Sequence, residues 1–193
     1  MYGNELAQKP GGEAAYTAII DTGSSNIAIS DDMFKSLKEK WQKDLPAIDC
    51  VTDDNFCQVM TPCTDVAGKL KPISFGIGGQ TFEMAPELYL HQAEGKRCQF
   101  AIHSNQLKGS TGNLVLIGDT LLRHLYQVYD FENETISLGI NKHSEGRILM
   151  FEDGKRPEDA PKIQTQEDNM NIIEKSRFAN MENDLHESWN NRW

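Results

Sequence analysis

Short apolar runs separated by polar and glycine-containing turns occupy most of the chain up to residue 142. Two of these runs, residues 18–20 and 26–29, are rich in isoleucine and have the length of short strands. Ser30 then provides a typical helix N-cap, and apolar side chains follow at helical spacing with lysines between them. Those apolar residues are Met33, Phe34, Leu37 and Trp41. The pattern predicts two strands and then one amphipathic helix.

From residue 70 the apolar pattern changes to a period of two, which is typical of strands with one buried face. Residues 73–77 and 82–84 flank Gly78 and Gly79, and this order predicts a β-hairpin rather than a phosphate-binding loop. Two further strands are predicted at residues 88–91 and 97–102.

The most apolar run of the chain, residues 114–117, predicts a central strand. Gly118 ends this run, and Asp119 is expected to cap a short helix at residues 120–125. A last hairpin is expected from residues 127–131 and 135–139. Taken together, the elements predict an all-β domain with short helices over residues 14–142.

The two ends of the chain differ in composition from this domain. Residues 1–13 show no period and include Pro10, Gly11 and Gly12, which predicts a loop. After residue 142 charged and amide side chains dominate, and Pro157 and Pro161 interrupt any pattern. Because sparse apolar side chains cannot offset the entropy lost on folding, residues 143–193 are predicted to form a mostly disordered tail.

The charge and hydropathy of the chain exclude some classes of partner. The formal net charge is −10 and the sequence pI is about 4.9, which disfavours a nucleic-acid partner. No apolar run approaches the roughly 20 residues of a membrane span. The first twelve residues lack the apolar segment of a signal peptide, so we expect either a cytosolic chain or a true N-terminus upstream.

The four cysteines are Cys50, Cys57, Cys63 and Cys98. An even number favours disulfides, for which three pairings are possible, and the spacing of the first two suits a small closed loop. Zinc is disfavoured because the chain has no Cys-x-x-Cys and no histidine at ligand spacing beside the cysteines. With the glycosylation sequon at Asn133, these features favour an oxidising compartment.

The candidate chemistry lies at the end of the first strand. The apolar residues 18–20 run directly into Asp21, and Thr22, Gly23 and Ser24 follow as turn residues. A strand that ends at a carboxylate inside a hydroxyl-rich turn fixes that carboxylate in space and surrounds it with donors. Such donors favour its ionised form.

Two segments far apart in the sequence resemble the pepsin-like aspartic protease family. Residues 18–25, Ala-Ile-Ile-Asp-Thr-Gly-Ser-Ser, resemble the active-site turn of that family. Residues 114–123 resemble its second signature, an apolar pair followed by Gly-Asp-x-x-Leu-Arg, and residues 126–139 resemble its closing hairpin. The resemblance covers residues 14–141 and implies one lobe of the pepsin-like fold. The late signature and the cysteines that flank the Gly-Gly hairpin are similar to the C-terminal lobe.

The resemblance implies peptide hydrolysis by a water molecule activated between two aspartates that share one proton. Asp21 would be one of the two aspartates, and Thr22 would take part in the hydrogen bonds that join the two active-site turns. Gly23 N–H and the Ser24 hydroxyl would donate to the carboxylate. No cofactor is expected, and the substrate would be a polypeptide.

Other residues receive structural roles from the same resemblance. Ile117 and Gly118 would lie beside the active-site turn, where the glycine lets its strand pass close by. Cys63–Cys98 would be the bridge of this lobe, and Cys50–Cys57 an additional local one. Asp119 lacks the glycine needed to repeat the Asp21 turn, so a helix-capping role is expected for it.

The chain holds a single Asp-Thr-Gly, so three interpretations remain open. In the first, it is the C-terminal part of a two-lobed protease whose N-terminal lobe is missing. In the second, two copies pair and bring Asp21 to Asp21. In the third, it is a non-catalytic binding module that keeps the fold. The family resemblance places the protein in the secretory pathway, as an extracellular or a lysosomal or vacuolar protein.

Overall fold

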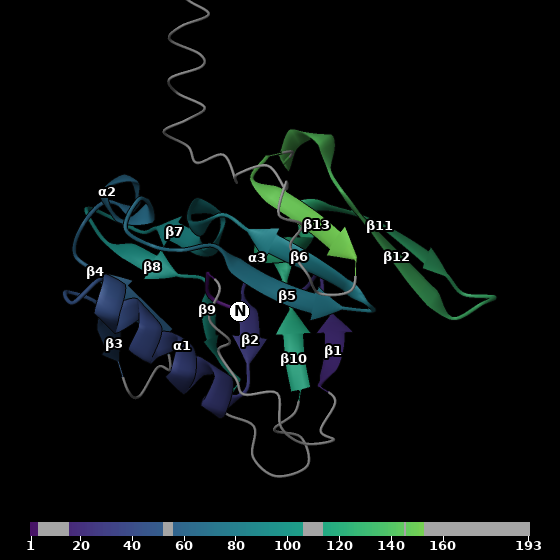
Figure 1. Cartoon of the computed structure of the whole chain (residues 1–193), viewed down its shortest axis with the longest axis horizontal. Coiled ribbons are helices and arrows are strands. Elements are labelled where there is room, and N and C mark those ends of the chain that lie inside the picture. Colours follow the sequence, from purple (N-terminus) through teal and green to yellow (C-terminus); the bar gives the residue numbers. More distant parts are fainter. Residues whose placement is uncertain (4–15, 52–55, 106–113, 145, 153–193) are drawn as a thin grey trace, which may run out of the picture. The chain divides into compact units, whose positions relative to one another are not determined.

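The computed structural model describes residues 1–3, 16–51, 56–105, 114–144 and 146–152. All of them belong to the first of two compact units, Met1–Ile163, whereas the second unit, Gln164–Trp193, lies outside the described residues. Strands dominate this part of the chain, and its helices are short except for one (Figure 1). The predicted all-β class is therefore confirmed. None of the described helices is long and apolar enough to cross a membrane.

A four-stranded sheet carries the first strand and the most apolar run. Its order is β1 (Thr17–Ile20), β10 (Leu114–Ile117), β2 (Ile27–Ile29) and β9 (Ile102–Ser104). β10 therefore lies inside the sheet, which confirms the predicted central strand. β1 and β10 run parallel with Ile20 opposite Ile117, so both strands end at the same edge of the sheet.

The predicted amphipathic helix is α1 (Asp31–Asp44), and its apolar side packs into the core. The Ser30 side chain caps it by accepting a hydrogen bond from the Met33 N–H. Trp41 is fully buried, and its ring lies 4.5 Å from that of Phe100 and 6.1 Å from that of Tyr89 between centroids. This aromatic group joins α1 to two later segments of the chain, the one that contains Tyr89 and the one that contains Phe100.

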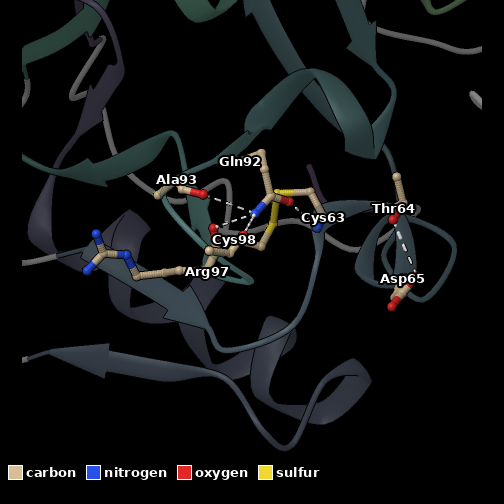
Figure 2. The surroundings of a disulfide bond; sticks show 8 residues. Cys63, Thr64, Asp65, Gln92, Ala93, Arg97 and Cys98 are labelled. Atoms are coloured by element: carbon tan, nitrogen blue, oxygen red, sulfur yellow. Dashed lines mark hydrogen bonds between the residues drawn. A yellow bond between two sulfur atoms is a disulfide. The ribbon is translucent and has the colours of Figure 1, made fainter.

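Two disulfides hold a second four-stranded sheet, β3 (Asp49–Val51), β4 (Phe56–Val59), β8 (Cys98–Phe100) and β7 (Leu90–Gln92). Cys50–Cys57 joins β3 to β4, and Cys63–Cys98 joins the start of α2 (Cys63–Ala67) to β8. These are the two pairs that the family resemblance implies. In Figure 2 the Gln92 amide lies beside the second bridge, where its oxygen accepts from Cys63 N–H and its nitrogen donates to the Arg97 carbonyl.

The hairpin predicted around Gly78 and Gly79 is β5 (Ile73–Ile77) with β6 (Gln80–Met84). Both glycines have positive φ, 57° and 80°, as a tight two-residue turn requires. The other edge of β6 pairs with β13 (Ile148–Glu152), which lies beside it in Figure 1. Residues 148–152 fall within the stretch that the sequence predicts to be mostly disordered, and for them the prediction is wrong because they complete a three-stranded sheet. The rest of the expected tail, from residue 153, lies outside the described residues.

Three smaller expectations also change. Residues 88–91 are not one strand, because Pro86 starts the 3₁₀ helix η1 (Pro86–Tyr89) and only then does β7 begin. Residues 97–102 form two strands, since the chain leaves β8 at Ala101 and enters another sheet as β9. The short helix is α3 (Asp119–Leu122), and Gly118 is its N-cap, so Asp119 is its first residue and not its cap.

The last predicted hairpin is confirmed as β11 (Leu125–Asp130) paired with β12 (Thr135–Ile140). It forms a two-stranded sheet of its own. The described residues have eight exposed large apolar side chains, and five of them lie on this hairpin and its turn. They are Tyr126, Val128, Tyr129, Phe131 and Ile136. A short 3₁₀ helix, η3 (Lys142–Ser144), then leads toward β13.

Candidate active site

The turn after β1 holds the Asp21 carboxylate by both of its oxygens. Gly23 N–H donates to Oδ1 at 2.9 Å, and the Ser24 hydroxyl donates to Oδ2 at 2.6 Å. The Asp21 backbone is fixed as well, since its N–H donates to the Ile117 carbonyl at 3.0 Å. The Ser24 hydroxyl, and after it the Gly23 N–H, lower the pKa of Asp21 below its ordinary value because both favour the ionised form. The turn therefore presents a fixed, ionised carboxylate.

Gly118 sits directly against this turn. A Cβ built on it would lie 2.2 Å from the Asn26 carbonyl oxygen and 2.4 Å from that of Ser24. The same approach lets Asp119 N–H donate to the Ser24 carbonyl at 2.7 Å and Thr120 N–H to the Ser25 carbonyl at 2.9 Å. Only glycine leaves room for this contact. The late strand-and-helix segment thus fixes the turn that carries Asp21.

The structure brings together most of the residues that sequence reasoning placed at the site. Ile117 is buried, and its carbonyl accepts from Asp21 N–H. Thr22 and Gly23 are exposed. Asp119 is also exposed and lies at the first position of α3. Asn133 lies elsewhere, in the β11–β12 turn, where its side-chain amide donates to Asp130 at 2.7 Å.

A cleft of about 640 Å³ continues from the far end of the turn. Ser25 and Asn26 line one part of it, and His91 and Gln99 line another from β7 and β8. Asp119 and Arg123 at the two ends of α3 complete the charged part of its wall, and Thr120, Phe56, Leu90, Phe100, Ala101 and His103 also line it. Sequence reasoning missed the cleft because its residues come from several separate segments with no common spacing.

The family model described as eukaryotic aspartyl protease matches residues 5–140. The chain therefore belongs to the eukaryotic aspartyl protease family. Vacuolar protease A of Neurospora crassa is 26% identical over 147 residues, which is 73% of this chain and 32% of that protein. Cathepsin D of Rattus norvegicus is 32% identical over 133 residues, which is 67% of this chain and 30% of that protein.

Solved structures give the same fold. An aspartic proteinase from Irpex lacteus superimposes with a TM-score of 0.53 at 21% identity, over 66% of this chain and 38% of that chain. At this identity the likeness concerns the fold. The chain spans about a third of the length of the relatives it matches.

Proposed function

We propose that this chain supplies one half of an aspartic endopeptidase site, with Asp21 as one of two catalytic carboxylates. The observation that supports this most is that hydrogen bonds hold the Asp21 carboxylate and its backbone in place. Both of its oxygens accept hydrogen bonds from residues within the turn, and the turn itself is fixed by Ile117 and by the close approach of Gly118. A carboxylate held this firmly is ready to meet a reacting group without reorganisation.

The chemistry follows from a second carboxyl group brought opposite Asp21. Alone, Asp21 is kept ionised by its two donors. A second carboxylate nearby cannot also ionise at low cost, so the pair would hold one shared proton and titrate as a unit. The ionised member would take a proton from water, and the protonated member would polarise the carbonyl of a peptide bond. The substrate in this proposal is a polypeptide.

The second carboxyl group would come from an N-terminal lobe outside this sequence, with this chain as the C-terminal lobe. The β11–β12 hairpin supports such a partner because it exposes apolar side chains on both faces. Tyr126 and Val128 alternate along one face, whereas Tyr129 and its cross-strand neighbour Ile136 lie on the other. A partner lobe that covered this hairpin would remove both faces from water.

We also propose an oxidising compartment of the secretory pathway for the protein, either lysosomal or vacuolar or extracellular. Its two disulfides fit that environment. One relative is called a vacuolar protease. Asn133 would be glycosylated there, since it lies exposed in a turn as the first residue of its sequon.

Cleavage of denatured globin at acidic pH, with and without pepstatin, tests the catalytic proposal. The natural gene product, recovered with an antibody raised against this chain, should cleave in a pepstatin-sensitive manner. The same product carrying Asp21→Asn should lose at least about a thousandfold in kcat, whereas a Met60→Ser control, at an exposed side chain outside the site and the hairpin, should keep its kcat. Activity that survives Asp21→Asn would refute the role of Asp21. Cleavage by the isolated chain would show instead that two copies pair.

A further inference from the structure

His124 is a buried histidine between α3 and β11 that the proposed catalytic chemistry does not use. Its side chain is 9% exposed. Nδ1 lies 2.8 Å from the Ser144 hydroxyl, and Nε2 lies 3.3 Å from Nε of Arg123. The backbone is also held, because Asn141 N–H donates to the His124 carbonyl at 2.9 Å. The imidazole therefore bridges the end of α3 and the helix η3.

The partners of the ring decide which nitrogen carries its proton. A guanidinium group can only donate, so the Arg123 contact requires a lone pair on Nε2. The single proton of the neutral imidazole must then be on Nδ1, from which it is donated to Ser144. A second proton would have to go onto Nε2, and there it would remove the acceptor and face the guanidinium directly.

Ser144 connects this ring to the C-terminal part of the described chain. Its carbonyl accepts from Arg147 N–H at 3.1 Å, and the Arg147 carbonyl accepts from Ala85 N–H at 2.9 Å. Directly after Arg147 the chain enters β13 and pairs with β6 (Figure 1). The contact between His124 and Ser144 therefore ties the segment that completes the three-stranded sheet to the residue that follows the C-cap of α3.

The charges around His124 oppose a second proton. Burial, Arg123 and Arg147 lower the pKa of His124 to about 4, and Asp119 opposes them with a smaller effect. The charged or titratable side chains on the elements around the ring are Asp119 and Arg123 of the α3 segment, Lys142 and His143 of η3, Arg147 after η3, and Glu87 of η1, which packs on α3.

We propose that His124, Ser144 and Arg123 form an acid-sensitive latch: in the closed state Ser144 holds a neutral ring whose Nε2 faces Arg123 and disfavours a second proton, and acid favours an open state in which residues 142–144 and 146–152 detach and the exposed ring carries two protons. This inference goes beyond the proposed function and does not depend on catalysis. It gives the protein a segment that is closed near neutral pH and opens under acidic conditions.

The pH range of the latch follows from linkage. In the open state the imidazole titrates near its ordinary pKa of 6.5, and in the closed state it titrates near 4. A depressed histidine pKa means that the open state binds more protons, so the closed state loses stability as the pH falls from 6.5 to 4. Between pH 7.5 and 4.5 these two pKa values increase the opening equilibrium by about 70-fold.

Amide hydrogen exchange of the full chain tests the latch. The protection factors of the Ala85 and Arg147 amides should fall by about 70-fold between pH 7.5 and 4.5. The Leu45 amide at the end of α1 is the internal control, and its protection factor should change far less. His124→Gln cannot be protonated and should remove the pH response. His143→Gln, at the exposed neighbouring histidine, should keep it.

Two further measurements cover the case in which His124→Gln fails to fold. Ser144→Ala should weaken protection of the Arg147 amide already at pH 7.5, because the ring loses its acceptor. Nitrogen chemical shifts of the unmodified chain should show His124 protonated at Nδ1. The proposal is overturned by an Nε2-protonated ring at neutral pH, by unchanged protection down to pH 4.5, or by a pH response that persists in His124→Gln.

Discussion

Gly118→Ala is the most direct test of how the active-site turn is held. The backbone of Gly118 has φ −100° and ψ −166°, an extended conformation that alanine adopts without strain. Only space opposes the added methyl group, since its carbon would lie 2.2 Å from the Asn26 carbonyl oxygen, 2.4 Å from the Ser24 carbonyl oxygen and 2.9 Å from the Ser24 carbonyl carbon. All three atoms belong to the backbone, so no flexible side chain can move aside.

The size of the effect follows from these distances. To reach even a tight separation the methyl carbon must retreat by about 1 Å, in an interior that is close-packed. That movement stretches the hydrogen bonds from Asp119 N–H to Ser24 and from Thr120 N–H to Ser25, now 2.7 and 2.9 Å long. Overpacking of this kind costs about 1–3 kcal/mol, and two weakened hydrogen bonds add about 1 kcal/mol. The reduced entropy of the unfolded chain returns about 0.5 kcal/mol. We expect a net loss of about 1.5–3.5 kcal/mol.

The measurement is urea unfolding of the full chain at pH 7, followed by tryptophan fluorescence and far-ultraviolet circular dichroism. Gly139→Ala is the matched control, because Gly139 also lies in extended structure and an added Cβ meets no atom within 4 Å. The control should be as stable as the unmodified chain or slightly more so. An Asp119 amide that exchanges faster in Gly118→Ala would place the damage at the turn.

Equal unfolding midpoints for Gly118→Ala and Gly139→Ala would refute this account. The close approach of Gly118 would then not be what fixes the turn. A loss in Gly118→Ala with an unchanged Asp119 amide would show that the strain is relieved elsewhere in the sheet.

Three other changes test the site and the core. Ser24→Ala should raise the pKa of Asp21 toward its ordinary value, because the carboxylate loses its hydroxyl donor. The stability that the ionised carboxylate contributes is then lost at a higher pH as the solution is acidified. A carboxyl NMR titration measures this pKa, and the absence of a rise would contradict the hydrogen bond. Trp41→Ala should cost about 3–5 kcal/mol in urea unfolding, whereas the exposed Tyr126→Ala should stay within about 0.5 kcal/mol. Replacing both cysteines of Cys63–Cys98 by alanine should cost about 4 kcal/mol from the 35-residue separation, and a loss below about 1 kcal/mol would disagree with the chain-entropy model.

The sequence by itself predicted those elements whose hydrogen bonds and apolar faces are local. The helix behind Ser30 and the hairpin at Gly78 both follow from signals within a few residues of each other. The strand that ends at Asp21 was found in the same way, and the composition of the following turn indicated its donors. Resemblance to a family then connected this turn to Gly118, far along the chain.

Only the tertiary structure decided which segments meet. Residues 148–152, Ile-Leu-Met-Phe-Glu, are a short apolar run in an otherwise polar stretch, and they form β13 because β6 offers an edge for pairing more than 60 residues away in the sequence. His124 had no partner at any informative spacing, and its link to Ser144 exists because β12 returns along β11, with Ile140 opposite Leu125, and brings η3 back to His124. The cleft is likewise built from separate segments. Periodicity reports which face of an element is buried, but it carries no information about which distant element covers that face.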